Sequence, residues 1–123
     1  MIIIDTDILI EIFDKKSKAG SQAFEKIIDS KDTFCVTVIN LHEILYGLLK
    51  YAKPMDDVML LPTLNFTKED AKLSSQIEFK TEAKGKRALR TDSMIAAIAI
   101  NNNAKLYTNN TAHFKDIDKL ELF

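Results

Sequence analysis

The chain has few of the residues that cross-link or interrupt a fold: one cysteine, two prolines and three glycines among 123 residues. A single cysteine excludes an internal disulfide and a zinc site built from several cysteines. Scarce glycine and proline predict short loops and a high helix content. Cys35 lies between Phe34 and Val36, in what looks like a buried strand, so we expect a small core residue rather than a reactive thiol.

The sequence also lacks a long hydrophobic run and an excess of either charge. The longest apolar run, Met94–Ile100, is far too short to cross a bilayer. Met1–Ile4 meets Asp5 at once, without the basic stretch and longer apolar core of a signal peptide. We therefore expect a cytoplasmic protein that makes no membrane contact. The net charge of −1 gives no overall basic field for binding nucleic acid, although acids gathered in a metal site would not repel a phosphate.

The remaining composition is that of an ordinary globular protein, with 46% hydrophobic and 28% charged residues in a length that fits one domain, residues 1–123. Short β-branched or apolar runs alternate with stretches of helical spacing. Strands are predicted at residues 2–4, 33–38, 64–66, 105–108 and 120–123, and helices at 8–13, 21–29, 41–51, 54–61, 67–83 and 88–101. This alternation predicts an α/β fold, a three-layer α/β/α sandwich with a mostly parallel central sheet.

Polar residues follow the predicted strands, where ligands bind in folds of this kind. Asp5 ends the first strand, and Glu43 lies in the first turns of the helix after the second strand. Thr108, Asn109 and Asn110 follow a later strand. Because the carboxyl ends of parallel strands meet at one edge of the sheet, we expect these residues to converge there.

Two of the acidic positions have an alternative role as a helix cap. A carboxylate directly after a buried strand needs a partner, so Asp5 and Asp7 suggest a site, but either could instead cap the helix that begins near Ile8. Both roles can hold, since one aspartate can cap while the other binds a metal. Glu43 lies to one side of an apolar helix stripe and could equally be a solvated acid of a first helical turn.

Asp92 opens a helix that is apolar on every side, which predicts a buried central helix. A carboxylate at the start of such a helix can be directed into an interior pocket. The alternative is again a cap, with Thr91 and Ser93 as competitors for that position.

Four segments, in order, resemble the motifs of the PIN domain, and most closely those of its VapC toxin branch. They are Asp5–Asp7 after its hydrophobic strand, Asn40–Gly47, Thr91–Ala97 and Leu106–Phe114. The resemblance covers nearly the whole chain. It implies a Mg²⁺- or Mn²⁺-dependent endoribonuclease that acts on RNA and is usually inhibited by a VapB-type antitoxin. Carried over by position, Asp5, Glu43 and Asp92 match the three acids of the family's catalytic site.

The sequence departs from the family pattern in the last motif, where many members have a fourth acid. Asn110 occupies one position where that acid is found, and His113 occupies the other. Asn110 can offer a carbonyl oxygen but brings no charge. A site with three acids holds one divalent ion readily and a second divalent ion less readily. An alternative is therefore a PIN-fold protein that binds RNA or a partner with weak or no nuclease activity.

Carboxylates are natural ligands for Mg²⁺ or Mn²⁺ in phosphodiester hydrolysis. We assign Asp5 and Asp92 as direct ligands, and Glu43 as the residue that holds or deprotonates a water beside the ion. The supporting residues would be Asp7, Thr108, Asn109 and Asn110. Thr108 and Asn109 could hydrogen-bond the first-strand carboxylates or the scissile phosphate, with a simple turn as the alternative for Asn109. Since clustered carboxylates repel one another, at least one should have a raised pKa when no metal is bound.

RNA contacts are expected from the basic stretch that leads into Asp92, although solvated helix ends and loops are an equally good explanation of each residue. This stretch contains Lys84, Lys86, Arg87 and Arg90. A second basic stretch, Lys15–Lys18, follows the first helix. His42 adjoins Glu43 but should point elsewhere on its helix.

Two other folds begin with early acids. A haloacid-dehalogenase phosphatase needs a hydroxyl residue where this chain has Leu9, and a receiver domain needs an aspartate at a middle strand end, where Thr37 and Phe66 stand.

Several apolar residues exceed what one small core needs, and part of this set could form a homodimer or antitoxin groove, with core packing as the alternative. They are Leu45, Leu48, Leu49, Tyr51, Met55, Met59 and Leu60.

Overall fold

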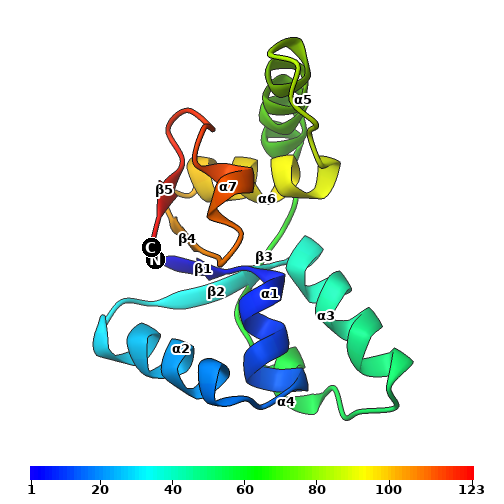
Figure 1. Cartoon of the computed structure of the whole chain (residues 1–123), viewed down its shortest axis with the longest axis vertical. Helices are drawn as coiled ribbons and strands as arrows, with labels where there is room; N and C mark the ends of the chain where they lie inside the picture. The colour runs from blue at the N-terminus through cyan, green and yellow to red at the C-terminus, as the bar shows by residue number, and fades with distance from the viewer.

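Five short strands form one parallel sheet in the order β3-β2-β1-β4-β5 (Figure 1). The computed structural model describes all residues, Met1–Phe123. The strands are β1 (Ile2–Ile4), β2 (Phe34–Thr37), β3 (Thr63–Leu64), β4 (Lys105–Tyr107) and β5 (Glu121–Leu122). The predicted α/β class is confirmed, and the sheet is wholly rather than mostly parallel.

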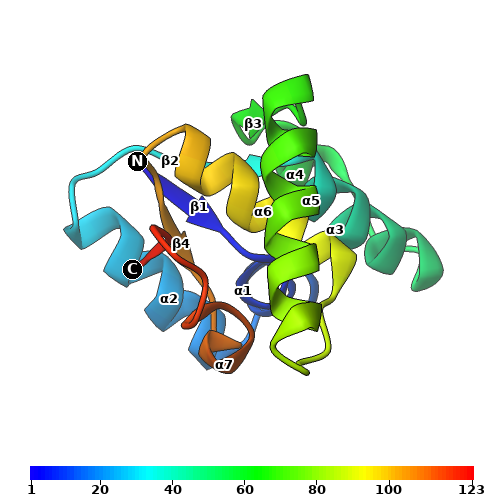
Figure 2. The same cartoon turned by 90° about the horizontal axis from the view of Figure 1, so that it is seen from above.

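Helices cover both faces of this sheet (Figure 1). Beneath it lie α1 (Thr6–Leu9), the π-helical turn η1 (Ile10–Asp14), α2 (Lys18–Asp29), α3 (Val38–Lys50) and α4 (Asp56–Met59). Above it lie α5 (Lys68–Ala83), α6 (Arg90–Asn101) and α7 (Thr111–Phe114). Viewed from above, α5 and α6 lie side by side over the sheet (Figure 2). This is the three-layer sandwich that the sequence predicted.

The strands divide the interior into two hydrophobic cores because successive side chains point to opposite faces. Ile3 and Cys35 pack with the helices above the sheet, whereas Ile4 and Val36 pack with those below it. Burial raises the pKa of the Cys35 thiol to about 11, which agrees with an inert core residue. The apolar helix α6 is buried as expected, and Ile95–Ala99 are at most 1% exposed.

Differences from the predicted elements lie mainly in the connections. The helix expected over residues 54–61 is only Asp56–Met59, because Pro54 and Pro62 bracket it. The chain between α5 and α6 is longer than expected, since Gly85, at φ 75°, follows the end of α5 and α6 begins only at Arg90. The segment that carries most of the predicted basic stretch is therefore a loop.

The chain order creates a switch point at the carboxyl ends of β1 and β4. The chain runs from β1 to β2 and β3 on one side, then continues through β4 and β5 on the other. Crossovers diverge at such a point, so a crevice forms there. The Asp5 N–H donates to the Tyr107 carbonyl at 2.9 Å, which joins the two strand ends. No helix is both long and apolar enough to cross a membrane.

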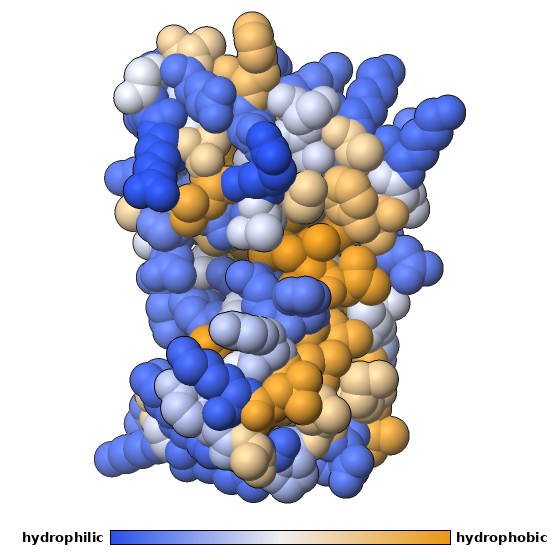
Figure 3. All heavy atoms as spheres, turned by 90° about the vertical axis from the view of Figure 1, so that its right-hand side faces the viewer, coloured by the Kyte–Doolittle hydropathy of each residue, from blue (hydrophilic) through white to orange (hydrophobic).

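The expected apolar surface is only partly exposed. Leu48 is buried, and Leu45 and Met55 are partly buried. Figure 3 shows apolar side chains gathered in a band on the face that carries α3. The exposed members of the expected set are Leu49, Tyr51, Met59 and Leu60, at 58–81% exposure. Leu48 is therefore excluded from any docking surface, whereas the four exposed residues remain available for one.

Candidate acidic site at the switch point

Asp5 is the buried centre of the site. Its side chain is 5% exposed, and its Oδ1 accepts hydrogen bonds from the Thr6 N–H at 2.9 Å and from Asn40 Nδ2 at 3.1 Å. Oδ2 accepts one from Thr108 Oγ1 at 2.7 Å. Asp5 is also the N-cap of α1. The two roles foreseen for the aspartate pair, capping and facing the site, therefore fall on the same residue.

Asn40 holds Asp5 from the start of α3. It forms a capping box with Thr37, in which the Asn40 N–H donates to Thr37 Oγ1 and Asn40 Oδ1 accepts from the Thr37 N–H. Oδ1 also accepts from Thr37 Oγ1 at 2.7 Å. With its amide oxygen fixed in this way, the Nδ2 group points toward Asp5 and Thr6. Asn40 is fully buried, so its orientation is fixed on every side.

Glu43 is joined to Asp5 through Thr6. Thr6 Oγ1 donates to Glu43 Oε1 at 2.8 Å and accepts from Asn40 Nδ2 at 3.1 Å. A continuous hydrogen-bonded chain thus runs from Asp5 through Asn40 and Thr6 to Glu43. Glu43 is half-buried and oriented, rather than a freely solvated acid.

Asp7 and the segment after β4 complete the centre. The Thr108 hydroxyl bonds the first-strand carboxylate as suggested, whereas Asn109 reaches Asp7 Oδ2 through its backbone N–H at 2.8 Å and not through its side chain. The Asn110 N–H donates to Thr108 Oγ1 at 3.0 Å. Asn110 supports the site through its backbone, and its side chain makes no hydrogen bond to the acids.

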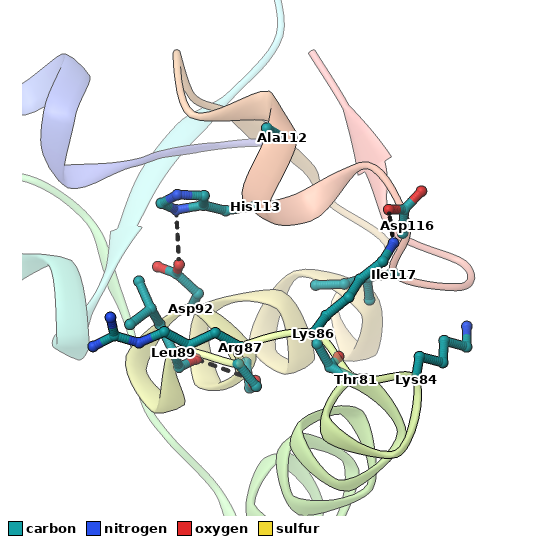
Figure 4. Close-up of a pocket in the computed structure, with 12 residues that line it drawn as sticks. Thr81, Lys84, Lys86, Arg87, Leu89, Asp92, Ala112, His113, Asp116 and Ile117 are labelled. Atoms are coloured by element: carbon teal, nitrogen blue, oxygen red, sulfur yellow. Dashed lines mark hydrogen bonds and ion pairs between the residues drawn. The ribbon is translucent and has the colours of Figure 1, made fainter.

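Asp92 lies in the first turn of α6 and does not cap that helix. The N-cap is Leu89, which makes no side-chain capping bond, so the alternative role of Asp92 is wrong. Asp92 Oδ2 instead lies 3.2 Å from His113 Nδ1 (Figure 4). Of the two residues at the fourth acid's positions, His113 is the one that contacts an acid of the site.

The pKa values show that Asp5, Asp7 and Asp92 form one electrostatic cluster. Burial raises the pKa of Asp5 to about 6, against hydrogen bonds from Thr108 and Thr6 that lower it, and repulsion from Asp7 and Asp92 adds to the rise. Burial also raises the pKa of Asp92, which the His113 charge and hydrogen bond partly offset. A raised pKa was expected among the clustered acids, but burial rather than mutual repulsion is its main cause.

The donor set fits a hard divalent cation bound partly through water. No three histidine, cysteine, aspartate or glutamate side chains lie close enough together to hold an ion by themselves. Mg²⁺ commonly takes one or two carboxylates and keeps several waters. Asp5 and Asp92 meet that requirement, since both offer oxygen donors whose ionisation would be favoured by a cation.

A cavity of about 400 Å³ opens beside Asp92 (Figure 4). Lys84, Lys86 and Arg87 line it, whereas Arg90 does not. Lys86 is paired with Asp116 at 2.6 Å. Figure 4 shows the Arg87 guanidinium on the Asp92 side of the cavity, with Lys84 extending in the opposite direction. Neither of these two side chains forms an ion pair.

Arg90 has a partner elsewhere. Its Nε and Nη2 donate to the two carboxylate oxygens of Glu78 on α5, at 3.0 and 3.1 Å. This bidentate pair joins α5 to α6 and explains why Arg90 is directed away from the cavity. Within the predicted basic stretch, Arg87 is therefore the unpaired cation nearest the acids.

Sequence reasoning did not assign a role to Thr6 or Asn40. The signal for Asn40 was present, because a threonine followed three residues later by an asparagine at a strand-to-helix junction resembles a capping box. Its bond to Asp5 could not be read from that pattern. Thr6 lies between two aspartates and gave no signal of its own.

Comparisons with known proteins agree with this fold. A family model described as the PIN domain matches residues 2–120. Among solved structures, VapBC2 from Rickettsia felis, bound to a promoter DNA fragment, has 28% identity and a TM-score of 0.83, over 100% of this chain and 98% of that one. DNA-bound VapBC from Salmonella typhimurium has 23% identity and a TM-score of 0.82, over 99% and 96%. FitAcB from Neisseria gonorrhoeae has 21% identity and a TM-score of 0.79, over 100% and 96%. No match was found among curated proteins.

Proposed function

The chain belongs to the PIN domain family, and from this premise we propose that it is a cytoplasmic metal-dependent endoribonuclease, the toxin of a VapBC-type pair. The family match confirms the resemblance seen in the four sequence motifs. The observation that carries the nuclease proposal is the burial of Asp5 among the charges of Asp7 and Asp92, which raises its pKa to about 6. Such a cluster is poised for a cation and lies beside a cavity lined by an unpaired arginine.

Each residue has a separate task in this proposal. When bound, a Mg²⁺ or Mn²⁺ ion would polarise the scissile phosphate and stabilise its developing charge. Asp5 and Asp92 would hold that ion, and Asn40 and Thr108 keep Asp5 in one orientation. Thr6 occupies Glu43 Oε1, which leaves Oε2 able to accept a proton from the attacking water. Arg87 would bind a phosphate of the RNA strand.

The nuclease proposal is tested with the Asp92→Asn variant. We expect wild type to cut a structured RNA in the presence of Mn²⁺ and to stop when EDTA is added. Asp92→Asn should cut at least about 10³-fold more slowly, because it weakens both metal binding and charge stabilisation. The measurement is the single-turnover cleavage rate on a labelled RNA. A matched control is Asp57→Asn, an exposed aspartate of α4, which should cut at the wild-type rate. Equal traces for wild type and Asp92→Asn would refute the proposal.

The RNA-binding role of the basic stretch is tested by comparing two arginines. Arg87→Gln should weaken RNA binding about 3- to 10-fold and reduce the slope of log affinity against log salt by about 0.7, as expected for one lost phosphate contact to a single strand. Arg90→Gln should leave both quantities nearly unchanged, because its guanidinium is already bound to Glu78. Fluorescence anisotropy in the Asp5→Asn background keeps the RNA intact. Equal losses for the two variants would contradict this assignment.

The toxin proposal draws on the structural neighbours, which include several VapBC complexes. We propose a VapB-type antitoxin as partner and a homodimer as the assembly. The exposed Leu49, Tyr51, Met59 and Leu60 offer apolar surface for these contacts. Co-expression with the product of an adjacent small reading frame tests this, since a VapB-type antitoxin should co-purify and suppress cleavage.

A second candidate function is a PIN-fold protein that binds RNA or a partner but cuts weakly. The observation that favours it is the absence of an acid at Asn110 and His113, together with the lack of any three-residue metal cluster. The cleavage assay separates the two candidates. RNA binding that depends on Arg87, without Mn²⁺-dependent cleavage, would support this second function.

A further inference from the structure

His113 is an ionisable side chain of the site that the proposed mechanism does not use. Its Nδ1 lies 3.2 Å from Asp92 Oδ2, and both residues line the cavity. The His113 side chain is 50% exposed and that of Asp92 is 21% exposed, so water and ions reach the space between them.

We propose that His113 Nδ1 is a ligand of the same cation as Asp92 Oδ2, and that this nitrogen makes the site favour Mn²⁺ over Mg²⁺. The proposal rests on the proposed function, because it adds a ligand to the same metal centre. Two neighbouring ligands bonded at about 2.1 Å and at right angles to each other are separated by about 3.0 Å. The observed 3.2 Å is close to this separation, and because no three such side chains lie close enough together to hold an ion, Asp5 would act on the ion through a water.

The position of His113 is fixed by its helix rather than by its own side chain. The next residue, Phe114, is 1% exposed and anchors α7 in the upper core. The His113 N–H donates to the Asn110 carbonyl at 3.0 Å, which fixes the backbone on the other side. The Nδ1 lone pair would bind the cation only when that nitrogen carries no hydrogen, and the imidazole would keep its one hydrogen on Nε2.

The preference for Mn²⁺ follows from the chemistry of the donor. Carboxylates and water suit Mg²⁺ and Mn²⁺ alike, whereas imidazole nitrogen binds transition-metal ions better than it binds Mg²⁺. An oxygen at this position, as an acid would provide, would treat the two ions more evenly. The alternative is that His113 only pairs with Asp92 and holds α7 against α6, in which case it would not discriminate between metals.

The test uses the fact that the chain contains only two histidines. In pulsed EPR of tag-free protein loaded with Mn²⁺, we expect coupling to one histidine nitrogen, and labelling with ¹⁵N-histidine should change that coupling. The signal should disappear in His113→Gln and persist in His42→Gln, which alters the other histidine, on α3.

Titration calorimetry should show that His113→Gln weakens Mn²⁺ binding about 10-fold and Mg²⁺ binding by less than about 3-fold. His113→Glu should bind Mg²⁺ at least as tightly as wild type.

Two different failures can be told apart. If Mn²⁺ binds, and binding is lost in Asp5→Asn, but no histidine nitrogen is coupled to it, His113 is not a ligand and the metal centre itself stands. His113 is likewise not a selective ligand if His113→Gln weakens the binding of both ions equally. If no Mn²⁺ binds, or if binding does not depend on Asp5 and Asp92, the proposed function and the role of His113 both fail.

Discussion

Replacement of Asp5 by asparagine is expected to slow RNA cleavage by about 10³-fold or more and to make the metal-free protein more stable at neutral pH. Loss of cleavage follows from losing a carboxylate that would hold the cation. The gain in stability follows from burial, because the Asp5 side chain is 5% exposed and its pKa is raised to about 6 from an ordinary value of 3.8. An active-site residue that opposes folding is typical of a preorganised centre.

The sign of the pH dependence follows from which state holds the proton more tightly. Since folding raises the pKa of Asp5, the folded protein keeps this proton to a higher pH than the unfolded chain. The resulting stabilisation is complete below about pH 4 and is lost as the pH rises through 6. A shift of about two pKa units corresponds to about 3 kcal/mol of unfolding free energy lost by pH 7.5.

Asparagine cannot ionise, so the Asp5→Asn variant avoids this cost but gives up one strong hydrogen-bond acceptor. We expect a net gain of about 1–3 kcal/mol in unfolding free energy at pH 7.5 in EDTA, shrinking to near zero at pH 4.5. Urea unfolding at the two pH values measures it. Adding Mn²⁺ should stabilise wild type and remove the advantage of the variant. A variant less stable than wild type at pH 7.5 in EDTA would contradict the burial argument.

The sequence predicted those parts of the fold that depend on local patterns. The apolar Ile2–Ile4 followed by Asp5 identified a strand end, and the apolar residues around every side of α6 identified a buried helix. From the alternation of strands and helices, the parallel sheet followed, and with it the convergence of Asp5 and Thr108. These features are repeated over many residues, so single exceptions do not obscure them.

What escaped prediction depends on contacts between distant segments. Asn40 reaches Asp5 only because β1 and β2 pair in register, with Ile3 beside Cys35. Arg90 was counted among the RNA-binding residues, yet it binds Glu78 because α5 packs against α6. Neither pairing leaves a trace in the spacing of either segment. The same holds for His113 and Asp92, whose contact requires α7 to lie over the start of α6.

Exchange of Asn40 for aspartate is expected to be among the most damaging single changes in the chain, although it alters the side-chain shape very little. Asn40 is fully buried, and its Nδ2 donates to Asp5 Oδ1 at 3.1 Å and to Thr6 Oγ1 at 3.1 Å. The aspartate keeps the bonds that Oδ1 makes with Thr37 but places its second oxygen against Asp5. Two buried carboxylates at this separation cannot both be ionised without a large cost.

We expect Asn40→Asp to lose about 3–5 kcal/mol of unfolding free energy at pH 7.5 in EDTA, a large part of the stability of a typical domain. At pH 5 the loss should shrink, because one proton shared between the two carboxyls restores a hydrogen bond. The folded state then holds a proton that the unfolded chain has released, so stability falls as the pH rises. Thr6 Oγ1 also loses the hydrogen bond that Asn40 Nδ2 donates to it, and Thr6 is the residue that orients Glu43. Cleavage should therefore fall even where the protein remains folded.

The matched control is Asn101→Asp, since Asn101 Nδ2 donates to Asp70 Oδ1 at 2.7 Å away from the site and Asn101 itself is exposed. It creates a second pair of facing carboxylates in which Asp70 is buried but the residue at position 101 is exposed, so it should cost less than Asn40→Asp and leave cleavage unchanged. Urea unfolding at pH 5 and 7.5 and single-turnover cleavage measure both variants. If Asn40→Asp unfolds at the same urea concentration as wild type at pH 7.5, Asn40 does not hold Asp5. Asp5 would then owe its orientation to Thr6 and Thr108 alone, and Glu43 would no longer be coupled to it.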